Sequence, residues 1–117
     1  MGEMKRKYLK ILRIEIEDLK YDIEGLIEEC NKEHEIGELS EYVFLENLVI
    51  FRRELLGLGV FSHILDSIDT DRFENLDEMV EFIRKSFIEK LEEHNLLKAI
   101  ILYVERKLEK VEKYVNQ

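Results

Sequence analysis

The chain has 117 residues, of which 45% are apolar and 38% are charged, and it contains no proline. This length and composition predict one globular domain, residues 1–117, and exclude an intrinsically disordered chain. The net charge is −9, and residues 14–51 carry twelve acidic side chains against two lysines. Such an acidic segment opposes non-specific binding to nucleic acid or to an anionic membrane.

Cysteine usage and hydropathy indicate the compartment. Cys30 is the only cysteine, so neither an intramolecular disulfide nor a paired-cysteine metal site can form. The basic residues near the start are followed by a segment that Glu and Asp interrupt, unlike a signal peptide. The uncharged run 47–51 is too short to span a membrane. We therefore expect a cytoplasmic protein. Its many Glu and Lys residues and single Gln also fit a thermophilic source.

The first predicted helix covers residues 3–31. Apolar side chains recur there at alternating steps of four and three residues, which is the seam of a helix that packs lengthwise on another. The seam consists of Leu12, Ile16, Leu19, Ile23, Leu26 and Cys30.

The second predicted helix covers residues 38–56 and is apolar nearly all round. Such a helix is buried on more than one side, so it is either the central core helix or one that also meets a partner chain. A strand over 42–51 is the competing interpretation, because that segment is rich in aromatic and β-branched residues. The residues expected to be core or interface are Phe44, Leu48, Phe51 and Leu55.

Glycines at 57 and 59 predict that this helix stops there and that a short connecting helix follows over 60–68. A third helix begins at Asn75, which with Glu78 forms a capping box. His94-Asn95 is the expected break before a fourth helix over 96–115. The fourth seam consists of Leu97, Ile100 or Ile101, Val104, Leu108, Val111 and Val115. The predicted fold class is therefore all-α, a single-domain bundle of four main helices plus a short connecting helix.

Motifs for chemistry are scarce. Di-metal helical bundles need Glu-x-x-His, but Asn31, Val60 and Leu91 stand three positions before the histidines. The HExxH, phosphate-loop and Gly-x-Ser-x-Gly patterns are also missing, so no catalytic residue and no cofactor is expected. One alternative is a metal-dependent enzyme. His63, Asp66 and Asp69 are spaced three apart, so on a continuous helix they would share a face and could chelate a divalent cation.

A second alternative concerns nucleic acid, through basic residues that are scattered along the chain. If Lys5, Arg6, Arg52 and Arg53 converged on one face, they would form a local positive patch despite the acidic total. The competing interpretation is that they pair with neighbouring glutamates.

Two resemblances bear on function. The chain is similar in size and helicity to HEPN domains, which are often RNases or toxin–antitoxin partners. Their catalytic Arg lies only a few residues before a His, whereas here Arg53 and Arg84 each precede a histidine by ten residues. The resemblance thus implies at most a HEPN-like helical partner or RNA-linked module without the catalytic motif. In its Glu- and Lys-rich, proline-free composition the whole chain also resembles small all-helical archaeal proteins of unknown function. This resemblance implies no activity.

The sequence therefore predicts a non-enzymatic helical interaction or structural protein. The excess of apolar side chains on the second helix favours a homodimer, or binding of another protein.

Overall fold

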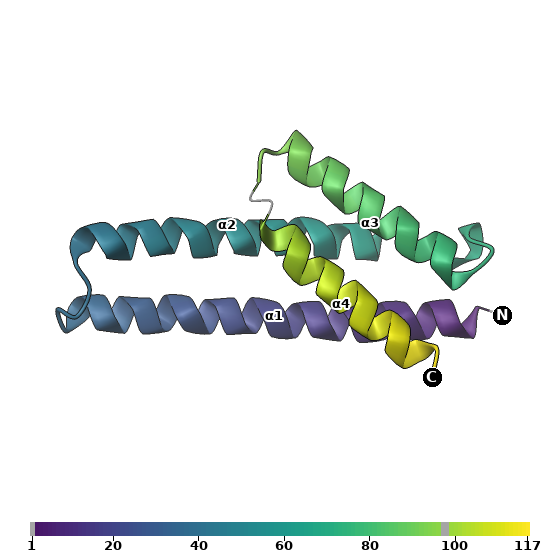
Figure 1. The fold of residues 1–117 in the computed structure, drawn as a ribbon, viewed down its shortest axis with the longest axis horizontal. Helices are drawn as coiled ribbons and strands as arrows, with labels where there is room; N and C mark the ends of the chain where they lie inside the picture. Colours follow the sequence, from purple (N-terminus) through teal and green to yellow (C-terminus); the bar gives the residue numbers. More distant parts are fainter. Residues whose placement is uncertain (1, 97–98) are drawn as a thin grey trace.

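The computed structural model describes residues 2–96 and 99–117. Over these residues the fold is all-α, as predicted (Figure 1). Its elements are α1 (Glu3–Glu35), α2 (Glu41–Asp66), the 3-10 turn η1 (Thr70–Arg72), α3 (Leu76–Glu93) and α4 (Ala99–Val115). The radius of gyration is 16.6 Å, against about 13 Å for a compact domain of this length. The molecule is therefore elongated.

The elongation comes from an antiparallel hairpin of the two longest helices, α1 and α2 (Figure 1). The helix α4 packs along α1, and α3 packs along α2. Both shorter helices lie over the half of the hairpin that contains the chain's N-terminus, and they leave the turn end bare. We call residues 21–56 the distal hairpin and the remainder the covered half.

The core fills the covered half. The largest fully buried side chains there come from all four helices, with Tyr8, Phe61, Phe87 and Ile100 among them. Within the distal hairpin, by contrast, the only buried apolar side chains are Ile23 and Cys30. The predicted seams of the first and fourth helices are confirmed at most positions, although Leu26 is 45% exposed. The seam position Leu97 lies outside the described residues.

The turn between α1 and α2 is set by helix caps at both sides. The helix α1 extends one turn beyond the predicted end, and Gly37 then adopts a φ of +82°. The Glu38 amide donates to the Glu33 carbonyl at 2.9 Å, which completes a Schellman motif. Ser40 caps α2 by accepting a hydrogen bond from the Val43 amide at 3.2 Å.

The predicted stop at residues 57–59 is wrong, because α2 runs through both glycines to Asp66. The helix continues past the glycines because its next turns supply buried side chains to the core. Gly57 is buried, and a Cβ atom built on it would lie 3.2 Å from Ile100 Cγ2. The glycine therefore permits a close crossing of α2 and α4 rather than ending a helix. The predicted short helix over 60–68 belongs mostly to α2, and η1 serves as the connector.

The start and end of α3 agree with the prediction. The Asn75 side chain accepts a hydrogen bond from the Glu78 amide at 2.8 Å. The Glu78 carboxylate accepts one in return from the Glu74 amide at 3.2 Å, one residue earlier than in a standard capping box. After His94, Asn95 adopts a φ of +53° and ends the helix. The buried residues of this helix are Leu76, Met79, Val80, Ile83, Phe87 and Leu91.

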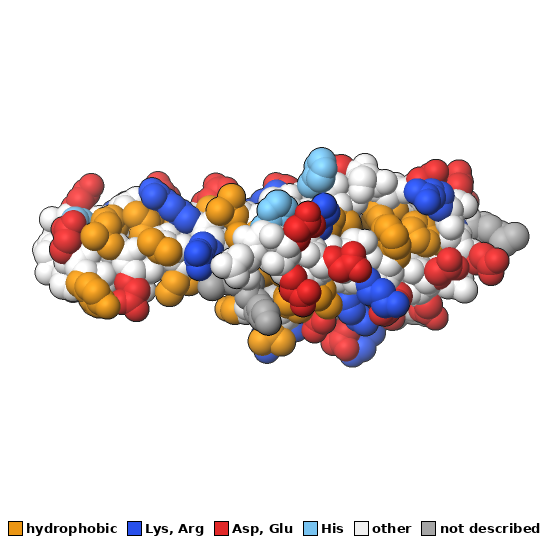
Figure 2. All heavy atoms as spheres, turned by 90° about the horizontal axis from the view of Figure 1, so that it is seen from above, with side chains coloured by type: hydrophobic (Ala, Val, Ile, Leu, Met, Phe, Trp, Pro, Cys, Tyr) orange, Lys and Arg blue, Asp and Glu red, His pale blue; other side chains and the backbone are white. Residues whose placement is uncertain are grey.

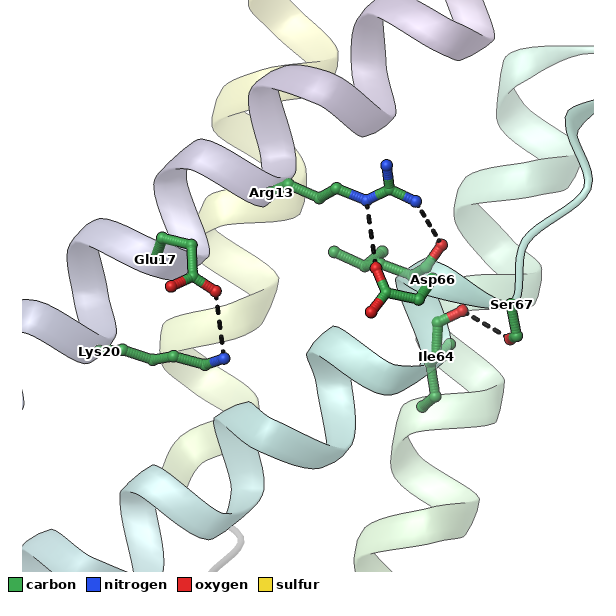
Figure 3. A network of polar contacts seen from close by, with 7 residues as sticks. Arg13, Glu17, Lys20, Ile64, Asp66 and Ser67 are labelled. Atoms are coloured by element: carbon green, nitrogen blue, oxygen red, sulfur yellow. Dashed lines mark hydrogen bonds and ion pairs between the residues drawn. The ribbon is translucent and has the colours of Figure 1, made fainter.

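Two basic side chains tie α1 to the rest of the covered half. The buried Lys5 ammonium donates to the carbonyls of Thr70 and Phe73. Arg13 donates to the Leu65 carbonyl at 3.0 Å and pairs with Asp66, so that a cation lies at the C-terminal end of α2 (Figure 3). This placement suits the helix dipole.

On the opposite side of α1, Glu15 lies 2.9 Å from both Lys107 and Lys110 of α4.

Within the described residues, no helix is both long and apolar enough to cross a membrane.

Candidate interaction surface on α2

The helix α2 carries one apolar seam that faces α1. Phe44, Leu48, Phe51 and Leu55, the predicted core or interface residues, follow a helical spacing, and all four are half-buried. The Phe44 ring stacks on His34 of α1 at 4.1 Å between ring centroids. Phe51 and Leu55 pack against the core. These four residues therefore serve mainly to hold the hairpin together, and we call them the inner seam.

A second seam on α2 has no cover from the described residues. It consists of Tyr42, Leu45, Val49, Arg52, Leu56, Gly59 and His63. These positions alternate in steps of three and four, which is the heptad spacing of a helix that packs on another helix. The exposed fractions are 76% for Tyr42, 49% for Leu45, 56% for Val49 and 61% for Leu56. We call this row the outer seam.

Neighbouring side chains widen the outer seam into a patch. Val43 and Ile50 are each 40% exposed and lie beside it. Figure 2 shows apolar side chains gathered over the turn end of the hairpin. A row of large apolar side chains in water is unfavourable unless another surface covers it, so such patches typically mark interaction sites.

The outer seam continues into a groove between α2 and the C-terminal end of α3. The groove has a volume of about 900 Å³. Its floor is apolar: Leu55, Leu56, Gly59, Val60 and Ile64. Its rim is formed by Arg52, His63, Lys90 and His94. No acidic residue lines it, although Glu93 lies 3.5 Å from the Lys90 ammonium. We call it the basic groove; Figure 2 shows its region near the middle of the molecule.

Space at the centre of this groove is open. A Cβ atom built on Gly59 would have no heavy atom within 4 Å among its non-neighbouring residues. Gly57, only two positions away, is instead packed tightly against Ile100. The two glycines therefore face different surroundings, one an internal crossing and the other an empty part of the groove.

Charge separates the two ends of the outer seam. Between residues 21 and 51 the chain carries nine acidic side chains and one basic residue, Lys32. The other end of the seam meets the basic groove. Six of these acids lie on α1 and only Glu41 and Glu46 lie on α2, so the acidic end belongs to the hairpin as a whole. A hairpin with an acidic end and a basic groove further along is electrostatically complementary to an inverted copy of itself.

The residues of the predicted metal site are engaged in structural contacts. Asp66 pairs with Arg13 at 3.6 Å, and the Asp69 carboxylate caps η1 by accepting from the Asp71 amide at 3.1 Å. His63 lies instead at the edge of the basic groove. Residues 2–96 and 99–117 contain no group of three or more His, Cys, Asp or Glu side chains arranged to hold a metal ion.

The basic residues on which the nucleic-acid alternative depends do not converge on one face. Lys5 is buried beside η1. Because Arg13 lies beside Leu65 in the antiparallel hairpin, Arg52 stands on the far side of Arg13 from Lys5. From the helical rise we place Lys5 and Arg52 about 30 Å apart along the hairpin axis. The condition for the nucleic-acid interpretation is therefore not met.

Two groups with a shifted pKa, Tyr8 and Glu15, form contacts between α1 and α4. Burial raises the pKa of the Tyr8 hydroxyl well above its ordinary value, and that hydroxyl donates to the Leu108 carbonyl at 3.4 Å. Hydrogen bonds from Lys107 and Lys110 lower the pKa of Glu15. Cys30 is buried on the α1 seam, which suits a small apolar side chain rather than a nucleophile.

Comparison of the chain with protein-family models, curated proteins and solved structures finds no match.

Proposed function

We propose that this chain is a non-enzymatic helical interaction protein that forms a homodimer through the outer seam of α2. The observation that carries the proposal is the second heptad row, whose four large apolar members are about half exposed or more. A helix with one seam packs against one neighbour, and α2 has two seams while α1 occupies only the inner one.

A second copy suits this surface better than an unrelated protein does. The e positions, on one flank of the heptad seam, carry Glu46 and Arg53, one of each sign. In a homodimer related by a two-fold axis, each copy offers both charges to the other, so the interface complements itself. Such flanking charges select the partner and its direction in helical pairs.

Sedimentation velocity over a range of protein concentrations tests the proposal. We expect a species of twice the monomer mass of 14.1 kDa at micromolar concentration. Val49→Asp places a charge in the middle of the outer seam and should abolish this species while leaving the helical circular dichroism unchanged. Leu102→Asp, at an exposed apolar position on α4, is the matched control and should remain dimeric.

A wild-type chain that stays monomeric at high micromolar concentration contradicts the proposal. So does a Val49→Asp variant that dimerises as well as the wild type.

A further inference from the structure

Resting on the proposed dimer, we infer that its two α2 helices run antiparallel, in a register that places the acidic hairpin end of each copy at the basic groove of the other. The inference begins from charge. In a parallel pair the two distal hairpins, each with ten acidic side chains against three basic ones, would lie side by side. Like charges opposed along a whole interface are strongly unfavourable, so the parallel arrangement is disfavoured.

The outer seam then restricts the register. In an antiparallel pair of helices, the a positions of one helix pack against the d positions of the other. Tyr42, Val49 and Leu56 occupy a positions, and Leu45, Arg52 and Gly59 occupy d positions. One register opposes Leu45 with Leu56 of the second copy.

The same register opposes Tyr42 with Gly59 of the second copy. The largest side chain of the seam thereby meets the residue with no side chain, at a point where the groove is open. Val49 meets the aliphatic stem of Arg52, whose charged end can remain at the rim. Every large exposed side chain of the seam gains a partner of complementary size.

The flanking charges agree with this arrangement. Glu46 and Arg53 both occupy the e position, and e positions face each other across an antiparallel pair. The Glu46 carboxylate of each copy therefore lies beside Arg53 of the other, twice per dimer. Neither residue forms an ion pair within the described part of the chain.

A shift by one heptad gives the competing register. It opposes Leu45 with Val49 and places the Tyr42 ring against Arg52. In that register Leu56 and the open space at Gly59 are left without a partner. The unshifted register is favoured because it fills the basic groove.

Disulfide trapping distinguishes these arrangements. In a Cys30→Ala background, the double variant Leu45→Cys/Leu56→Cys should oxidise to a covalent dimer. Its two cysteines are about 16 Å apart on one helix, so they cannot bridge within one chain. Each single-cysteine variant should remain unlinked. Leu45→Cys/Val49→Cys should remain unlinked too, because it reports the shifted register.

The possible outcomes test the proposed register and the proposed dimer separately. Cross-linking of Leu45→Cys/Val49→Cys, or of a single-cysteine variant, overturns the proposed register while the dimer stands. A monomer in sedimentation overturns both. If the protein sediments as a dimer and none of the variants cross-links, both the proposed register and the shifted one are overturned.

Charge reversal gives an independent test that does not depend on oxidation. Glu46→Arg and Arg53→Glu should each raise the dimer dissociation constant by about tenfold, because each puts two like-charged pairs into the dimer. The double variant should return it to within about threefold of wild type, since both pairs are restored with reversed sign. Additive losses in the double variant contradict the Glu46–Arg53 contact.

Discussion

The two halves of the α1–α2 hairpin are built on the same helices, yet they use their apolar side chains differently. In the covered half, α3 and α4 bury the surfaces that the hairpin leaves open, and the core contains side chains from all four helices. In the distal hairpin α2 stays apolar over a wide arc, but among the described residues only those of α1 lie against it. The comparison shows that the composition of a helix does not by itself predict which of its side chains are buried. The distal apolar residues are available for a surface outside this chain.

The largest expected difference between the halves is in how much the free energy of unfolding falls when an apolar side chain is truncated to alanine. Phe61 is fully buried in the covered half and meets Phe87 edge-to-face at 4.9 Å between ring centroids. Phe61→Ala should lower the free energy of unfolding by about 3–5 kcal/mol, as other core aromatic truncations do. Urea unfolding followed by circular dichroism measures the loss.

The matched distal change is Val49→Ala, at an exposed position. Measured at a concentration where the protein is monomeric, it should change the free energy of unfolding by less than about 0.5 kcal/mol. Comparable losses for Phe61→Ala and Val49→Ala would remove the distinction between the two halves.

The glycine pair sharpens the comparison at the boundary between the halves. Gly59→Ala should stabilise the protein by up to about 1 kcal/mol, because alanine favours helix and the site is open. Gly57→Ala should destabilise it by about 1 kcal/mol, because the new methyl group presses on Ile100. Thermal unfolding of both in the monomeric Val49→Asp background excludes any effect on the interface. Equal shifts for both variants are the result that contradicts the close crossing.

Helix caps offer a smaller test of the same kind. Asn75→Ala removes the side chain that accepts from the Glu78 amide and should cost about 1 kcal/mol of global stability. Ser40→Ala should cost less in global unfolding, because the distal end of the hairpin can fray locally without disturbing the core. Amide hydrogen exchange should instead show the Ser40→Ala effect as faster exchange near residue 43. A global loss from Ser40→Ala larger than that from Asn75→Ala would be inconsistent with the distal hairpin being the less stable half.

The smallest expected effect concerns pH and the α1–α4 contact. Hydrogen bonds from Lys107 and Lys110 lower the pKa of Glu15 in the folded protein. The stabilisation is therefore fully present above the ordinary glutamate pKa, and it is lost as pH falls through the lowered value. Glu15→Gln should lower stability at neutral pH and lessen its decline in acid. Unfolding midpoints compared at several pH values below neutrality measure this, and parallel curves for the two proteins would show that Glu15 contributes nothing.

Helical periodicity and cap residues predicted the fold class, the inner face of α4 and the ends of α3, since those features depend on local spacing and caps. It failed at Gly57, where the helix continues because Ile100, far along the chain, needs the space. Sequence reasoning singled out α2 as the candidate interaction helix, and the four residues it named as core or interface lie on the inner seam. The signal of the outer seam, the spacing of Tyr42, Leu45, Val49 and Leu56, was present in the sequence. An all-round apolar helix does not reveal which of its rows another helix occupies.

The pairing of the first helix with the last has a consequence for how the chain emerges from the ribosome. Glu15 and Lys107 are 92 residues apart, and the Tyr8 hydroxyl reaches the carbonyl of a residue 100 positions later. The hairpin can form as soon as α2 has been made, because its contacts are local. The apolar face of α1 that packs against α4 stays exposed until α4 has been made. A nascent chain in this state is prone to aggregation, so the covered half is where we expect chaperones to bind during synthesis.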